Sequence, residues 1–408
     1  MANNNNNKIL NVPNKRFPEF TGEWKKTSVT ELLDFYSTNS LAWEQLNYEN
    51  GEIMNLHYGL IHKGLPTLVD LEKECLPFIN HNSVPKNYYL CQNGDVAFAD
   101  ASEDTNDVAK IIEFKNCADR KVVCGLHTIH GRDKSDVTAI GFKGYAFSSD
   151  SFHKQIRRIA QGTKIYSINT KNFNETFIGI PSKEEQSKIA RLLSLLDQRI
   201  STQNKIIEDF KKLMSAIVDL FYITSDQCCK LGDLIIQTSE RNKSKTKNAV
   251  LSVSNKNGFV IQSEQFEDRI IASDDTSNYK IVRLNDFAYN PARINVGSIA
   301  RLSEYKEGIV SPMYICFKTN ELVLPEYIEY FFETRHFYKE MIKRLEGSVR
   351  LCLSYESLCD IYMPLPSIET QNNIQKRINT ILSKITIETC VLKNLELEKS
   401  FLLQQMFI

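Results

Sequence analysis

The sequence predicts an α+β fold in which two globular α/β domains alternate with two long helices. Three features of the 408 residues predict this fold. Short apolar runs alternate with Gly, Asn, Asp and Ser clusters up to Phe177, a heptad series follows Pro181, and the pattern begins again at Lys230. Because two helices of equal length each follow their own domain, we expect an antiparallel coiled coil with pseudo-two-fold symmetry.

The composition is that of an ordinary globular chain, with 42% hydrophobic and 25% charged residues. The chain starts with an asparagine run over residues 3–7 instead of an apolar leader, and no apolar run approaches the roughly 18 residues of a membrane helix. The ten cysteines include no CxxC pair, so we expect reduced thiols in a cytoplasmic protein with no membrane contact. Because the formal net charge is zero, a DNA-binding role needs local basic patches or basic partner subunits.

The first long helix is predicted over residues 182–221, where apolar residues recur in steps of four and three. Some forty residues at about 1.5 Å each make a rod of roughly 60 Å. Pro181 ends the preceding segment, Ser182 suits the N-cap, and Glu185 is placed to complete a capping box. Only Gln203 interrupts the seam, whose apolar residues are Ile189, Leu193, Leu196, Ile200, Ile207, Phe210, Met214, Ile217 and Phe221.

The second half of the chain repeats the first, and from Gly162 (Gly347 in the second copy) onward the shift stays at 185 residues. Ser367 again suits an N-cap, but Thr370 replaces the glutamate, so we expect a weaker cap. Lys399 occupies the position of Met214, so we expect irregularity near the end of the second helix. Glu388 occupies the position of Gln203, and the other second-helix seam positions stay apolar: Ile374, Ile378, Ile381, Ile385, Leu392, Leu395, Leu402 and Met406.

Gln203 and Glu388 lie near the middle of the two predicted helices. In an antiparallel pair they should meet, and a polar pair in a seam can fix the register of the helices. The alternative is that they are two unrelated polar residues at the surface. For the helices themselves, the alternative is that each lies on its own domain without touching the other.

The predicted domain order is a tail and lead-in (1–25), a first globular domain (26–181), a central helix (182–224), a second globular domain (225–366) and a C-terminal helix (367–408). Within the first domain we expect strands over 95–99, 121–124 and 165–168, and a short helix over 150–160.

The sequence contains no motif that predicts catalysis. It has no Walker-type phosphate loop and no GxGxxG after a strand. The segment 289–292 (YNPA) resembles the Asn-Pro-Pro-aromatic motif of amino-methyltransferases but lacks its second proline and its aromatic residue. Asp95 with Glu113 and Lys115 forms a nuclease-like pattern that is common by accident. We therefore predict no catalytic residues.

Cys117, Cys124, His127 and His130 bring together the residue types of a metal site within a short span. The segment 122–130 fits better a strand, a turn and a second strand, with side chains alternating between two faces. We therefore predict no metal site.

Basic residues gather in two parts of the chain, over residues 110–171 and in the loop 241–247. Ammonium and guanidinium groups there suit contacts with DNA phosphates, and an arginine can also bond guanine through two hydrogen bonds. Taken singly, each is more often a solvated surface charge. The predicted DNA-binding residues are Lys115, Arg120, Lys121, Arg132, Lys134, Lys143, Lys164, Arg241, Lys243, Lys245 and Lys247, with Arg293 and Arg301 as candidates for reading bases.

The chain resembles the specificity subunit of type I restriction–modification systems over nearly its whole length. The resemblance is carried by the order of the repeat and by short segments in both copies. These segments are 16–20 (RFPEF), 22–24 (GEW), 125–128 (GLHT), 162–164 (GTK), 180–186 (IPSKEEQ), 286–291 (DFAYNP), 311–314 (SPMY) and 364–366 (PLP).

The resemblance implies that each globular domain is a target-recognition domain for one half of a bipartite, asymmetric DNA sequence. The two helices would form the coiled coil that sets the spacer and would dock two methylase subunits. It also implies that motor-nuclease subunits join for restriction. This chain would bind no cofactor and perform no catalysis, while the partner subunits would hold S-adenosylmethionine, ATP and Mg. The rival interpretations are a coiled-coil scaffold with two protein-binding domains and a stand-alone methyltransferase or nuclease.

Overall fold

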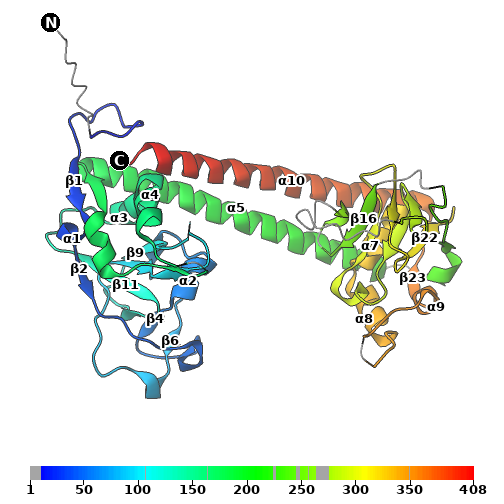
Figure 1. Ribbon diagram of the computed structural model, residues 1–408. Helices are drawn as coiled ribbons and strands as arrows, with labels where there is room; N and C mark the ends of the chain where they lie inside the picture. The colour runs from blue at the N-terminus through cyan, green and yellow to red at the C-terminus, as the bar shows by residue number, and fades with distance from the viewer. Residues whose placement is uncertain are drawn as a thin grey trace, which may run out of the picture. The chain divides into compact units, whose positions relative to one another are not determined.

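The computed structural model describes residues 11–105, 107–162, 164–223, 227–244, 249–255, 257–262, 275–348 and 350–408. These residues form two compact units. Unit 1 comprises Met1–Asn204 and Cys390–Ile408, and unit 2 comprises Lys205–Thr389. Each unit therefore contains one part of each long helix, α5 (Lys183–Ile223) and α10 (Ile368–Gln405), which Figure 1 shows as the two longest elements.

Unit 1 is built on two mixed sheets. The larger sheet has the strand order β2-β11-β7-β9-β5 and the smaller sheet the order β10-β4-β6-β3, and two-stranded sheets join β1 to β13 and β8 to β12. The elements, with η for short 3₁₀ helices, are β1 (Lys25–Ser28), α1 (Val29–Leu32), β2 (Leu33–Tyr36), η1 (Trp43–Gln45), β3 (Leu46–Asn47), β4 (Met54–Leu56), α2 (Tyr58–Lys63), β5 (Leu68–Asp70), β6 (Phe78–Ile79), η2 (His81–Ser83), β7 (Val96–Ala99), β8 (Ala101–Ser102), β9 (Ile111–Lys115), β10 (Val122–Cys124), β11 (Thr128–Asp133), α3 (Phe142–Phe147), α4 (Asp150–Ile159), β12 (Tyr166–Ser167), η3 (Thr170–Glu175) and β13 (Phe177–Ile180).

Unit 2 repeats this plan with fewer strands. Its sheets have the orders β15-β22-β19-β20 and β17-β16-β21-β18, and β14 pairs with β23 as β1 does with β13. Its elements are β14 (Cys228–Lys230), η4 (Leu231–Asp233), β15 (Ile235–Thr238), β16 (Val250–Ser254), β17 (Gly258–Ile261), β18 (Lys280–Arg283), β19 (Phe287–Tyr289), η5 (Ile294–Val296), β20 (Ile299–Arg301), β21 (Glu307–Val310), β22 (Ile315–Thr319), α7 (Pro325–Phe332), α8 (Arg335–Lys343), α9 (Tyr355–Cys359) and β23 (Tyr362–Pro364).

The predicted repeat is present down to single hydrogen bonds. The side chain of Gln186 accepts a bond from Ala139 N (2.7 Å) and donates to the carbonyls of Val137 (3.2 Å) and Pro181 (2.9 Å). In the second copy Gln371 accepts from N of residue 324 (2.8 Å) and donates to the carbonyls of residues 322 (3.1 Å) and 366 (2.9 Å). Every partner is shifted by the same 185 residues. These bonds join the start of each long helix to its own unit.

The core of each unit includes both long helices. In unit 1, Ile189 and Leu193 near the start of α5 share a cluster with Met406 and Phe407, which follow α10. In Figure 1 the C-terminus accordingly lies beside β1 and the first turns of α5. Asp197 also pairs with Lys399 at 2.6 Å. Within unit 1, the beginning of one helix therefore packs against the end of the other.

Unit 2 has the opposite ends of the two helices in its core. Val218 and Tyr222 near the end of α5 share a cluster with Ile374 and Ile378 near the start of α10. In both units, then, the two helix segments that pack together run in opposite directions.

The seam positions form the less exposed face of both helices. The most buried of them are Ile189, Leu193, Leu196, Gln203, Ile207, Ile374, Ile378 and Met406. The others are half-buried: Ile200, Phe210, Met214, Ile217, Phe221, Ile381, Ile385, Glu388, Leu392, Leu395, Lys399 and Leu402. Gln203 and Glu388 belong to different units, and their pairing stays a prediction.

Two sequence expectations about the helices were wrong. The irregularity expected at Lys399 is absent, because α10 is continuous to Gln405 and the Lys399 ammonium is held by Asp197. The capping box at Ser182 forms only in part. The Ser182 hydroxyl accepts from Glu185 N (3.3 Å), but the Glu185 carboxylate binds the Arg16 guanidinium instead, at 2.7 Å from each oxygen.

The short elements expected in the first domain are confirmed. Strand β7 lies within 95–99, β10 within 121–124 and β12 within 165–168, and α4 lies within 150–160. The strand, turn and strand expected over 122–130 are β10 and β11. Among the described residues, no helix combines the length and the apolar character needed to cross a membrane.

Candidate nucleic-acid interface

Six of the basic residues singled out from the sequence are solvent-exposed. Arg120 and Lys121 immediately precede β10, Lys164 follows α4, and Arg241, Lys243 and Arg293 lie in loops of unit 2. Of these, the Arg241 guanidinium donates to Asn278 Oδ1 (3.0 Å). Lys245 and Lys247 lie outside the described residues. Because they are exposed, these side chains are accessible to a phosphate backbone.

Three further predicted residues are held by acceptors within unit 1. The Lys115 ammonium is 3.2 Å from Asp70 Oδ2. The Lys134 ammonium donates to the Thr30 carbonyl (2.8 Å) and is 3.5 Å from Asp34. Arg132 makes two bonds with the buried Asp95 carboxylate, at 2.8 and 2.7 Å, and one with the Leu90 carbonyl, at 2.9 Å.

Lys143 is buried, which suits a structural role rather than contact with DNA. Its side chain is 2% exposed, 3.6 Å from Glu113 Oε1 and 2.5 Å from the Thr138 hydroxyl. Glu113 also accepts from the backbone N–H groups of Gly141 (2.8 Å) and Gly144 (2.7 Å). Burial raises the pKa of the Glu113 carboxyl, although Lys143 and the two N–H groups lower it in part. This network joins β9 to the start of α3.

Arg301 is the counterpart of Glu113 in the second copy. Glu113 pairs with Val96 across β7 and β9, and Arg301 pairs with Phe287 across the matching strands β19 and β20. The guanidinium of Arg301 donates to Asn285 Oδ1 (2.7 Å) and pairs with Glu326 (3.1 Å) and Glu329 (2.8 Å). The two glutamates correspond by the 185-residue shift to Gly141 and Gly144.

A strand is thus linked to a helix in both copies, through the Glu113 carboxylate in unit 1 and through the Arg301 guanidinium in unit 2. Because the Arg301 side chain is 12% exposed and paired with two carboxylates, it is poorly placed to read a base edge.

Unit 1 carries an aromatic–basic surface that the sequence analysis missed. We use this name for Tyr36, Lys86, Tyr88, Tyr89 and Arg132. The Tyr36 and Tyr89 rings are 5.0 Å apart, and the Arg132 guanidinium lies over Tyr36 at 4.8 Å. Tyr88 and Tyr89 are 40% and 50% exposed, and Lys86 is exposed.

Two of the predicted basic residues, Arg120 and Lys121, lie next to this surface. The bridge between Leu90 and Val123 brings the segment of the two tyrosines against β10, beside Arg120 and Lys121. The sequence signal was the run 86–90 (KNYYL), in which a lysine stands two residues before a pair of tyrosines. Cations neutralise phosphates, and large flat rings next to them can contact sugars and bases, so the arrangement suits a nucleic acid.

A buried carboxylate orients the arginine of this surface. Asp95 is 1% exposed and accepts from Arg132, from His130 Nε2 (2.8 Å) and from Gln92 N (2.8 Å). Burial would raise the pKa of the Asp95 carboxyl, but the bonds from Arg132 and His130 outweigh it and lower that pKa. The carboxylate therefore stays charged and holds the guanidinium against Tyr36.

The four candidate metal ligands from the sequence do not form one group, and Cys117 is half-buried and is not among the clustered ligands. Cys124 and His130 are buried together with Cys91, which the sequence analysis did not consider. His127 is 49% exposed and lies 3.1 Å from Asp100, so it is not part of that cluster. The alternating side chains of β10 and β11 could not reveal Cys91. This residue lies 33 residues before Cys124, outside both strands.

The chain is similar to known proteins in part of its sequence and in its fold. Residues 22–212 match the family described as type I restriction modification DNA specificity domain. No curated protein is significantly similar in sequence. The S subunit of the type I restriction–modification system from M. genitalium is a similar solved structure, with a TM-score of 0.54 and 16% identity over 97% of this chain and 99% of that chain.

Another similar structure was reported as the structural basis of complex assembly and conformational transition of the type I R-M system. It has a TM-score of 0.55 and 15% identity, covering 96% of this chain and 98% of that chain. At these identities the likeness shows the fold, and the family match over residues 22–212 supports a role in DNA specificity.

The mixed α/β units and long helices, together with the matched domain, define a protein that confers DNA sequence specificity. Residues 22–212 match the DNA specificity domain of type I restriction–modification systems, and the chain as a whole has the fold of solved S subunits of such systems, as the resemblance in its sequence predicts.

Proposed function

We propose that each of the two repeated units reads one half of a bipartite, asymmetric DNA target, and that this chain directs methylation without catalysing it. The observation that carries the proposal is the repeat itself. Two units with matching sheet orders are joined to the starts of two long helices by the same three hydrogen bonds, made by Gln186 and Gln371. Two similar but non-identical readers on one chain suit a target of two different halves.

We further propose that α5 and α10 pair as an antiparallel coiled coil that sets the distance between the half-sites. Packing inside the units supports this, because the start of α5 meets the end of α10 in unit 1 and the reverse occurs in unit 2. A helix of 41 residues is about 60 Å long, the length of about 18 base pairs. Half-sites separated by several base pairs would fit such a rod, since each reader also covers its own bases.

The aromatic–basic surface is our candidate for the contact of unit 1 with DNA. Exposed Lys86, Arg120 and Lys121 would contact phosphates and orient the unit on the duplex. Tyr88 and Tyr89 would lie at base edges or sugars, and Arg132 is held between Asp95 and Tyr36. In unit 2 the exposed Arg241, Lys243 and Arg293 remain candidates for the same role.

Partner subunits would supply the chemistry. We propose that two modification subunits, which would hold S-adenosylmethionine, dock on the long helices, and that motor-nuclease subunits using ATP and Mg join for restriction. Exposed apolar residues off the seam support the docking. Ile206, Leu213 and Leu220 recur every seven residues along α5 and are 36%, 48% and 56% exposed. A stripe of this kind is typical of a helix that binds another protein.

Mobility shift with random-sequence duplexes, with and without the modification subunit, tests the assignment to DNA. We expect selection of one bipartite sequence in the presence of the partner. Tyr89→Ala should weaken discrimination at one half-site about tenfold, the order of one lost base contact, and leave the other half-site unchanged. Tyr338→Ala, which removes a tyrosine 53% exposed on α8, is the matched control.

Selection of no sequence in either case would favour the rival, a coiled-coil scaffold that binds proteins. S-adenosylmethionine binding or DNA cleavage by the isolated chain would instead favour a stand-alone enzyme.

A further inference from the structure

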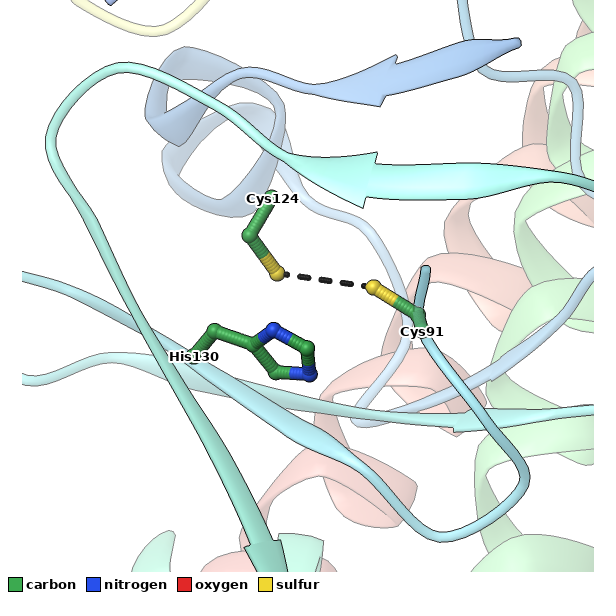
Figure 2. A group of neighbouring side chains, drawn as sticks. All are labelled: Cys91, Cys124 and His130. Carbon is green, nitrogen blue, oxygen red and sulfur yellow. Dashed lines mark hydrogen bonds between the residues drawn. The ribbon is translucent and has the colours of Figure 1, made fainter. Parts of the chain in front are cut away.

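Three potential metal ligands lie together in the core of unit 1, beneath the aromatic–basic surface. The sulfur atoms of Cys91 and Cys124 are 3.6 Å apart, and the ligand atoms of Cys91, Cys124 and His130 all lie within 4.8 Å of one another. The three residues are 4%, 2% and 0% exposed. Figure 2 shows the two sulfur atoms facing each other, with the His130 ring beside them.

The imidazole of His130 has one nitrogen satisfied and one unsatisfied. Nε2 bonds the charged Asp95 carboxylate at 2.8 Å, and a carboxylate can only accept, so Nε2 carries a proton. In the neutral ring Nδ1 is then a lone-pair acceptor, yet this buried atom has no hydrogen-bond partner. In Figure 2 one ring nitrogen is turned toward the sulfur atoms. A carboxylate behind one nitrogen and an open lone pair on the other is the arrangement of a metal-binding histidine.

The second copy shows that the fold does not need these residues. Cys91 precedes Gln92, whose N–H binds Asp95, as Val282 precedes Arg283, whose N–H binds Asp286. The matching bridges, Leu90 with Val123 and Ile281 with Ile309, make Val310 the counterpart of Cys124.

His130 has its own counterpart on the matching strand. It faces Ala97 across β11 and β7, as Cys316 faces Ala288 across β22 and β19. Val282, Val310 and Cys316 form part of an apolar cluster, so the same place is filled in unit 2 by two valines and one thiol, with no imidazole and no pair of thiols.

We propose that Cys91, Cys124 and His130 bind one thiophilic d¹⁰ cation, Zn²⁺ or Cu⁺, through two thiolate sulfurs and Nδ1. Bonds of about 2.3 Å to sulfur at a tetrahedral angle separate two sulfurs by about 3.8 Å, close to the spacing present here. Thiolates select both ions, and three protein ligands suit either a three-coordinate Cu⁺ or a Zn²⁺ with one further ligand.

The charges of the site are also compatible with its burial. Two thiolates neutralise Zn²⁺, and the nearby Asp95 carboxylate is already neutralised by Arg132, 2.7 Å away. Binding would release the thiol protons to solvent, so affinity should fall as the pH is lowered. The ion would hold His130, and through Asp95 it would fix Arg132 on the aromatic–basic surface.

Metal analysis of the full chain tests this site without DNA or partner subunits. The chain is loaded under reducing conditions with Zn²⁺ alone or with Cu⁺ alone, desalted and assayed for bound metal. We expect one equivalent of one of the two ions. If that ion is Zn²⁺, the chain loaded with Co²⁺ in its place should show sulfur-to-metal charge-transfer absorption.

The double variant Cys91→Val, Cys124→Val carries the side chains of the second copy and should fold but bind no ion, which circular dichroism and metal assay together check. Cys316→Val, which removes a buried thiol from unit 2, is the control and should leave the stoichiometry unchanged.

Two results would overturn the site. In the first, the loaded wild-type chain holds no more metal than the double variant. In the second, the chain is trapped from cells with a Cys91–Cys124 disulfide, which would assign the pair to redox chemistry. Because neither readout involves DNA, they are independent of the proposed recognition of half-sites.

Discussion

Asp95 connects the buried and the exposed residues of unit 1. It accepts from His130 in the core and from Arg132 at the surface, while Arg132 lies against Tyr36. A charged group this buried is stable only while its partners remain, because an unpaired buried charge costs several kcal/mol.

Replacing Asp95 with asparagine should therefore lower the free energy of unfolding of unit 1 by about 3 kcal/mol near neutral pH. The pKa of Asp95 is lowered in the folded chain from its ordinary 3.8, so its contribution is complete above that value. The contribution is lost as the pH falls below 3.8 and through the lower folded pKa.

Urea unfolding from neutral to acid pH measures this effect. The difference between wild type and Asp95→Asn should shrink below pH 4, and Asp136→Asn, at a carboxylate 93% exposed, should show little difference at any pH. A gap between wild type and Asp95→Asn that is constant down to acid pH would show that Asp95 is not the stabilising charge.

Single residues were the hardest part of the site to predict from sequence. A lysine's charge can be read from the sequence, but its partner cannot. Lys143 looked like a phosphate contact until the fold placed Glu113 beside it, and Arg301 looked like a base reader until Glu326 and Glu329 enclosed it. Cys91 was overlooked for the same reason, since it lies in a loop and its neighbours Cys124 and His130 come from β10 and β11.

Near the start of each long helix, one buried glutamine forms hydrogen bonds with its own unit. Gln186 and Gln371 each make three bonds with their own unit, at nearly the same distances. Both side chains are about 1% exposed or less, so removing either leaves polar backbone groups without a partner.

Gln186→Ala and Gln371→Ala should each lower the free energy of unfolding by about 1–3 kcal/mol, with similar losses because the bonds are the same. Urea unfolding followed by circular dichroism measures the loss. Gln198→Ala, at an exposed position of α5, should change it little. If one of the two variants had the same free energy of unfolding as wild type, these hydrogen bonds would not stabilise both copies.

At the level of elements, prediction from sequence succeeded where the pattern is local. Heptad spacing identified α5 and α10, and alternation with turn signals identified β7, β10 and α4. The failures were contacts with distant segments. Glu185 was expected to cap its own helix, but Arg16 from the lead-in takes its carboxylate.

For the whole molecule, the proposal assigns base recognition to the units and spacing to the helices. Inserting seven residues at matched positions in α5 and α10 adds two helical turns to each and should preserve the seam. We expect the half-sites to stay the same and the spacer to lengthen. The altered chain is compared with wild type in cells that supply the modification subunits, and a changed half-site would contradict this division of roles.

The sequence also predicted an order for the whole chain, because a repeat can be detected without knowing any contact, and the two long helices of that order are present. It could not predict the bases read, since these depend on which side chains reach the groove from loops such as 84–91 and 119–121.

Methylome sequencing of cells carrying this chain with its modification subunits measures whether the chain directs methylation to a bipartite target. We expect methylation that depends on the chain, at one asymmetric motif of two defined halves separated by a spacer of fixed length and undefined sequence. Methylation that is unchanged when the chain is removed, or a single continuous motif without a spacer, would contradict it.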